Sequence, residues 1–219
     1  MIVKSYEDFF SWVLPDVSGC PEITAIQAIR DSVIAFCEQS LIHQVDLDPI
    51  SVLAKIAHYD IDTPVSGHRV TKIMKAWYKG TELMPAAPDQ VRDPSVYNQH
   101  IGGYETQYST PKYFSQKGWN SFSLLPIPDQ SLTSAITMRV ALVPLRTSTG
   151  CEDFLLEQWV EPIAAAAVSK LQLSAGRPYS NPAAAAIHQA TYIRGLNAAR
   201  QKANRGYTRS NLSVQLRRI

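Results

Sequence analysis

Five histidines are the side chains in this sequence best suited to metal binding or to acid–base catalysis near neutral pH. They are His43, His58, His68, His100 and His188. No two of them stand at the short spacing typical of zinc ligands in one helix or turn. The three cysteines, Cys20, Cys37 and Cys151, form no CxxC pair, so we interpret them as buried thiols rather than as metal ligands or a disulfide framework. We therefore expect no metal site.

Four carboxylates at Glu152, Asp153, Glu157 and Glu161 could supply an acid and a base, or oxygen ligands for a divalent cation. A simpler interpretation is favoured, because Glu152 and Asp153 suit the positive end of a helix and the other two, spaced i,i+4, fit a solvated helix face. The sequence also contains no GxGxxG, no GxxxxGK[ST] and no GxSxG motif, so nucleotide binding and serine-hydrolase chemistry have no support. We expect no catalytic residue and no cofactor, although an enzyme remains the third and least favoured alternative.

Aromatic residues alternate with lysines in the middle of the chain, a combination that can stack single-stranded bases. The aromatic residues are Tyr97, Tyr104, Tyr108, Tyr113, Phe114 and Trp119, and the lysines are Lys112 and Lys117. The favoured interpretation is the core and rim of a β domain. Base stacking stays open as an alternative.

Charge is distributed very unevenly along the chain. Nine of the 21 basic residues follow Glu161 and none of the 19 acidic ones does, so residues 1–161 carry a formal charge of −7 and the rest +9. Like charges gathered at a terminus are typical of interaction tails. In the final stretch, TRSNLSVQLRRI, Leu212, Val214 and Leu216 alternate with polar residues. This is the periodicity of a strand, and it predicts an arm that adds a strand to another sheet edge. Binding of nucleic-acid phosphate by the arginines is the alternative.

The elements that must position these residues are helical at both ends of the chain. The chain has 219 residues, 45% of them hydrophobic, enough for one domain or two small ones. Apolar spacing predicts a helix from about Pro21 to Ser40, and prolines with β-branched runs predict strands from about Asp46 to Leu145. Two of these strands, WNSFSLLPIP and SLTSAITMRVALVPL, are expected to be joined by a turn. A helix beginning at Cys151 and a second from about Pro182 to Ala203 make a hairpin.

The expected fold class is α+β: a helical bundle from the N- and C-terminal helices, with an inserted small antiparallel β domain and an extended C-terminal arm. Its parts are 1–45, 46–149, 150–203 and 204–219. Small side chains let the two helices of the hairpin approach closely. We expect neither a signal peptide nor a membrane-spanning segment.

The order of parts is more specific than any single motif. The stretches FSLLPIPDQS…ITMRVALVPLRTS, EQWVEPIAAAAVSKL, SAGRPYSNP and TYIRGLNAARQKANRG, the last followed by a basic strand-like tail, together resemble the head-to-tail adaptor (connector) proteins of tailed bacteriophages. The resemblance covers most of the chain. Its stretches are structural signatures, so they point to a part of the virion and to no catalytic site.

The resemblance implies a structural virion protein at the head–tail junction, made in the host cytoplasm. It implies a ring of twelve subunits beneath the portal protein, through which double-stranded DNA passes without sequence specificity. A further tail protein (a tail tube, nozzle or second adaptor) would lie below, and no membrane is involved. A nucleic-acid-binding module that uses the basic arm is the alternative.

Two sets of residues are expected to carry this function. The partner-binding arm comprises Arg205, Tyr207, Arg209, Leu212, Val214, Leu216, Arg217, Arg218 and Ile219. The small residues expected to support packing in the ring are Ala164, Ala165, Ala167, Ala183, Ala185 and Ala186.

Overall fold

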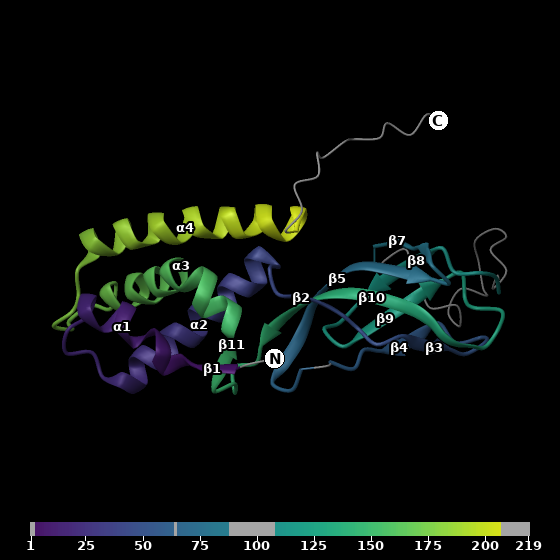
Figure 1. Ribbon diagram of the computed structural model, residues 1–219, viewed down its shortest axis with the longest axis horizontal. Helices are drawn as coiled ribbons and strands as arrows, with labels where there is room; N and C mark the ends of the chain where they lie inside the picture. The colour runs from purple at the N-terminus through teal and green to yellow at the C-terminus, as the bar shows by residue number, and fades with distance from the viewer. Residues whose placement is uncertain (1–2, 64, 88–107, 207–219) are drawn as a thin grey trace, which may run out of the picture. The chain divides into compact units, whose positions relative to one another are not determined.

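The computed structural model describes residues 3–63, 65–87 and 108–206. The chain divides into two compact units (Figure 1). Residues 1–42 together with 149–219 form the helical unit, and residues 43–148 form the β unit.

The helical unit contains long helices joined to short elements near its N-terminus. In chain order, its elements are β1 (Val3–Ser5), a 3-10 helix (Tyr6–Phe9), α1 (Phe10–Val13), a second 3-10 helix (Leu14–Asp16), α2 (Glu22–Ser40), β11 (Gly150–Glu152), α3 (Asp153–Gln172) and α4 (Pro182–Arg205). The helix expected from Pro21 to Ser40 is confirmed as α2. Pro21 caps its start in an extended conformation, and Leu41 ends it in the left-handed conformation, with φ of 55°.

Three of these helices share an aromatic contact at Phe36 on α2. Phe36 is fully buried, and its ring centroid lies 5.6 Å from that of Trp159 on α3 and 6.4 Å from that of Tyr192 on α4. Tilted ring pairs at such distances add to the free energy gained by burying their apolar area. One side chain therefore links α2, α3 and α4.

Helices α3 and α4 approach each other closely at Pro162 and Gly195. Added to Gly195, a Cβ atom would overlap the Pro162 ring, so only glycine fits this crossing without a shift. Elsewhere along the pair, the Ser169 hydroxyl donates a hydrogen bond to the Ala185 carbonyl over 3.1 Å. Trp159 in α3 has non-helical angles (φ −132°, ψ 18°). The local cause is Pro162, which lacks the N–H that would bond to the carbonyl of residue 158.

The two segments of the helical unit, residues 1–42 and 149–219, each have a strand near their start, and these two strands form a sheet. Strand β1 pairs antiparallel with β11, with Lys4 opposite Cys151. The expectation that a helix begins at Cys151 is therefore wrong, because residues 150–152 are extended and α3 begins at Asp153. Gly150 is required by this pairing, since a Cβ there would overlap the Lys4 carbonyl oxygen.

In the part of the β unit that the structure describes, the strands form two sheets. Its strands are β2 (Gln44–Asp46), β3 (Ile50–Val52), β4 (His58–Asp60), β5 (His68–Tyr78), β6 (Thr81–Glu82), β7 (Met84–Pro85), β8 (Tyr113–Gln116), β9 (Ser121–Leu125) and β10 (Leu132–Pro144). One sheet has the order β2-β10-β5-β6, with β3 also pairing with β10, and the other has the order β4-β9-β8-β7. The pairing is antiparallel except between β7 and β8, which are parallel.

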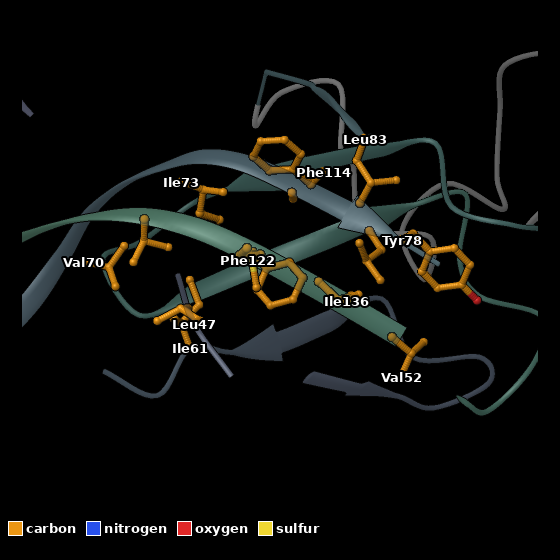
Figure 2. Packing of buried hydrophobic residues seen from close by; sticks show 14 of the residues in the cluster. Leu47, Val52, Ile61, Val70, Ile73, Tyr78, Leu83, Phe114, Phe122 and Ile136 are labelled. Carbon is orange, nitrogen blue, oxygen red and sulfur yellow. The ribbon is translucent and has the colours of Figure 1, made fainter. Parts of the chain in front are cut away.

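The core of the β unit is formed by side chains from both sheets (Figure 2). Buried residues of β5 and β10 belong to it, with Val70 opposite Leu142 and Ile73 opposite Val140, and the register shifts between these two pairs. Phe114 of β8 and Phe122 of β9 contribute from the second sheet.

On the outside of the first sheet, Arg139 donates 2.7 Å and 3.0 Å hydrogen bonds to Asp46. This pairing lowers the pKa of Asp46 below its usual value.

The expected fold class, a helical bundle with a small inserted β domain, is wrong. Within the described residues the chain is an α+β protein rich in sheet, with eleven strands beside four α-helices. The β unit spans residues 43–148 and has a hydrophobic core of its own. A segment of this length with two facing sheets can bury enough apolar area to be a domain in its own right. The helical unit, moreover, also contains a sheet.

The two strands expected to be joined by a turn do not pair with each other. The first is β9 and the second is β10, and they lie in different sheets. The connecting residues therefore carry the chain from one sheet to the other, so a turn signal between two apolar runs does not establish a hairpin.

Candidate interaction surface

Helix α4 buries one face and exposes the opposite one. Its start is well defined, because the Asn181 side chain accepts a hydrogen bond from the Ala184 N–H over 3.1 Å and Pro182 occupies the first turn. Its buried residues are Ala185, Tyr192, Leu196 and Ala199. Figure 1 shows the helix lying along α3 by one side, with its other side turned away from the helical unit.

The exposed side of α4 is apolar over its first half. We call Ala183, Ala186, Ile187, Ala190 and Ile193 the α4 apolar face. All five are exposed, with exposed fractions of 70% for Ile187 and 48% for Ile193. They recur at helical spacing, so they form one continuous stripe over about three turns. Single exposed apolar residues are ordinary, whereas a contiguous stripe is typical of an interaction site.

The charge of α4 is opposite to that of the rest of the helical unit. The helix carries Arg194, Arg200, Lys202 and Arg205 and no acidic residue. Residues 3–42 and 149–181 carry ten acidic and four basic residues, a formal charge of −6. Two of the cations are engaged within the unit: Arg200 donates to the Gln39 carbonyl over 2.9 Å, and Lys202 donates to the Gln158 side chain over 2.7 Å. Arg194 and Arg205 are exposed.

The alanines expected to pack in the ring fall into two groups. Ala164, Ala165, Ala167 and Ala185 are buried within one chain, with exposed fractions of 6% or less. Ala183 and Ala186 are exposed on the α4 apolar face. Only this second pair is accessible to another molecule in the described structure. Sequence reasoning missed Ile187 and Ile193, because an apolar residue on a helix gives no local sign of which face it occupies.

Substituting the two groups of alanines should therefore have different effects. Ala165→Leu places three extra carbons in a packed site and should lower the free energy of unfolding of the helical unit by about 1–3 kcal/mol. Ala186→Leu, on the exposed side of α4, should change it by less than about 0.5 kcal/mol. Urea denaturation followed by circular dichroism at 222 nm measures both. Equal stability of the two variants would contradict the placement of Ala165.

Most of the expected partner-binding arm lies outside the described residues. Arg205 is placed, and it belongs to the last turn of α4. The helix thus continues two residues beyond the expected end at Ala203. The remaining arm residues, which lie beyond position 206, are Tyr207, Arg209, Leu212, Val214, Leu216, Arg217, Arg218 and Ile219.

Two histidines that are far apart in sequence are neighbours in the β unit. The ring centroids of His43 and His68 lie 5.4 Å apart, edge to face, and both residues are buried. Strand β10 brings them together: the His43 carbonyl accepts from the Leu142 N–H, and His68 is opposite Pro144. Spacing along the chain could not reveal this pair, because it depends on the register of three strands.

The other described histidines are each paired with a different kind of group. A nitrogen (Nδ1) of His58 lies 2.7 Å from the Ser123 hydroxyl, and His188 lies 3.8 Å from an Asp16 oxygen. Ser123 is almost fully buried, with an exposed fraction of 2%, so a substrate could not reach its hydroxyl without movement of the surrounding residues. His100 lies outside the described residues.

The buried thiols are poor nucleophiles. Burial raises the pKa of Cys37 well above its usual value, and burial together with the neighbouring Glu152 carboxylate raises the pKa of Cys151 to about 12. Thiols with such pKa values stay protonated at neutral pH, and the thiolate is the reactive form. The interpretation as buried thiols is confirmed for Cys37 and Cys151, but it is wrong for Cys20, which is only partly buried.

The four carboxylates considered as an acid–base site are in different surroundings. Glu152 is buried in β11, Asp153 lies 3.7 Å from the Lys4 ammonium, and Glu157 and Glu161 are exposed on α3.

The aromatic residues considered for base stacking also lie in different surroundings. Phe114 belongs to the core, whereas Tyr108, Tyr113 and Trp119 are about half exposed. Tyr97 and Tyr104 lie outside the described residues.

No protein-family model matches this sequence, and no curated protein matches it. Among the described helices, none is both long enough and apolar enough to cross a bilayer.

Proposed function

We propose that this protein is a structural component of a bacteriophage virion and not an enzyme: a head-to-tail adaptor that forms a ring beneath the portal. In this role it joins the capsid to the tail and surrounds the channel through which double-stranded DNA passes. Its partners are the portal protein, further copies of itself that make a ring of twelve, and a tail protein below.

The exposed side of α4 is the observation that carries this proposal. A stripe of five apolar residues on a basic helix, within a unit that is otherwise acidic, is suited to repeated contacts between like subunits. The order of parts along the chain, with its resemblance to connector proteins, supplies the identity of the assembly. Neither observation requires a catalytic site.

The C-terminal arm supplies the second contact. In the proposal, Leu212, Val214 and Leu216 add a strand to a sheet edge on a partner, and the arginines steer the arm toward acidic surface. The alternative function, nucleic-acid binding, is favoured by the same arginines, because cations neutralise phosphates whatever the base sequence. The two functions depend on different side chains of one short segment, and this makes them separable by mutation.

We expect the arm's leucines to matter more than its terminal arginines. Leu212→Asp with Leu216→Asp should abolish stable attachment to portal rings, because charged residues then replace the side chains that would enter the partner's pockets. Arg217→Gln with Arg218→Gln should weaken attachment less, and mainly at low salt, because screening at higher salt already removes most of the attraction that these two arginines supply. Electron microscopy of the purified full chain mixed with the portal protein from the same genome measures the occupied fraction of rings.

A DNA-binding arm predicts the opposite order, with arginine loss damaging and leucine loss tolerated. Gel-shift titration of the same variants with a DNA duplex at two salt concentrations provides the control. An arginine-dominated result in both assays would overturn strand docking. Portal rings that bind no wild-type chain would overturn the adaptor function itself.

A further inference from the structure

The α4 apolar face leaves the side chains of five apolar residues exposed to water. Burial of such area is worth about 25 cal/mol per Å², so leaving Ile187 and Ile193 in water costs free energy that a partner surface would recover. Arg194 follows the stripe directly, and Arg205, at the end of α4, lies on the same side of the helix by its spacing. A matching partner must therefore combine apolar and acidic groups.

The chain itself carries exposed acidic and apolar residues in the first elements of the helical unit. Glu7, Asp8, Trp12, Glu22 and Ile23 are exposed residues of the first 3-10 helix, of α1 and of the first turn of α2, and we call this set the N-terminal acidic surface. Its two apolar members are strongly exposed, with fractions of 53% for Trp12 and 69% for Ile23. Neighbouring Asp16 is excluded from this set, because it already lies 3.8 Å from His188 of α4.

Both surfaces belong to the helical unit. Helix α1, which carries Trp12, packs on α3, and α3 packs on α4. Figure 1 shows α3 lying between α4 and α1 in this view. Both sets of residues are exposed within one copy, so a second copy can present its acidic surface to α4 and leave its own α4 open.

We infer that the α4 apolar face of one copy docks on the N-terminal acidic surface of a second copy. The contact is heterologous, because it joins two different surfaces, and contacts of this type build rings when the rotation closes. A symmetric contact between two α4 helices is disfavoured, since α4 has no Asp or Glu to balance the cations of both copies. The inference specifies the ring contact of the proposed function and rests on it to that extent.

Variants that disable one surface at a time test this inference on the purified full chain. The α4 variant carries Ile187→Asp and Ile193→Asp, and the acidic-surface variant carries Trp12→Asp and Ile23→Asp. Trp119→Asp is the matched control, because Trp119 is a comparably exposed aromatic residue (54%) in the β unit. Sedimentation velocity over a concentration series measures association, and circular dichroism confirms folding. If an aspartate variant misfolds, the same positions are changed to serine and association is measured on the serine variant.

The expected result is concentration-dependent association of the wild type and of the Trp119→Asp control. Each surface variant alone should associate at least tenfold more weakly. A one-to-one mixture of the two surface variants should form a heterodimer and nothing larger, because one intact α4 face then meets one intact acidic surface and both remaining surfaces are blocked.

Several results would overturn the inference. A wild type that stays monomeric throughout the series would do so, as would an α4 variant that associates like the wild type. A mixture that yields no heterodimer would show that these two surfaces do not bind each other. Portal binding is measured separately, so self-association can fail while the adaptor function stands, and self-association can succeed on a protein that never binds a portal.

Discussion

Replacing Phe36 with alanine should lower the free energy of unfolding of the helical unit by about 3–5 kcal/mol, the range found for large aromatic residues removed from a core. Phe36 is fully buried and contacts Trp159 and Tyr192. Its removal leaves a cavity bordered by three helices that are held by many other contacts, so the cavity cannot collapse fully. Hydrogen exchange of the α2, α3 and α4 amides measures the loss, since each 1.4 kcal/mol is a tenfold change in protection.

Phe122→Ala is the matched control for this prediction. Phe122 is as deeply buried as Phe36, but it belongs to the β unit, where its ring stacks 5.5 Å from that of Tyr59. The control should reduce protection in β4, β8 and β9. Unchanged protection of α2, α3 and α4 in the Phe36→Ala variant would contradict the packing described for the three helices.

Local patterns were sufficient to predict α2 and the start of α4. The apolar residues of α2 repeat at helical spacing between a proline and a left-handed Leu41, so its bounds could be placed within one residue. The start of α4 was equally clear, because Asn181 and Pro182 are a cap and a first-turn residue. These signals lie within a few residues of the ends that they mark.

Pairing between distant segments could not be predicted in the same way. Strand β11 pairs with β1 across almost 150 residues, and the acidic residues that follow Cys151 resemble a helix start whether or not the preceding residues are extended. The β9–β10 connection shows the same limit, because a turn between two strands does not determine which sheet each one joins. Register and sheet membership depend on the whole core of the unit.

The candidate interaction surface was predictable only in part. The concentration of positive charge after Glu161 is visible in the sequence, and so are the small residues of both C-terminal helices. Which alanines face the interior follows from how α3 and α4 pack, and that depends on residues such as Gly195 and Ser169. Ala185 and Ala186 are neighbours in the chain, yet one is buried and the other exposed.

The contact between Pro162 and Gly195 leads to the last prediction. In an isolated helix, replacing glycine with alanine stabilises by about 1 kcal/mol. At position 195 the added Cβ would overlap Cβ of Pro162 and lie 2.7 Å from its Cγ, well inside the 3.5–4.0 Å at which carbon atoms attract each other. The proline ring is rigid, so α3 and α4 must separate. Gly195→Ala should therefore destabilise the helical unit, and Gly195→Leu should cost about 3 kcal/mol or more, at the upper end of overpacking.

Ala198→Leu provides the control for the leucine variant, because Ala198 is exposed three residues further along the same helix. It should leave the free energy of unfolding within about 0.5 kcal/mol of the wild type. Urea denaturation monitored at 222 nm compares all three variants on one scale. The sign of the Gly195→Ala effect is decisive: a gain in stability would mean that helix propensity outweighs the contact, and that α3 and α4 do not meet closely at this crossing.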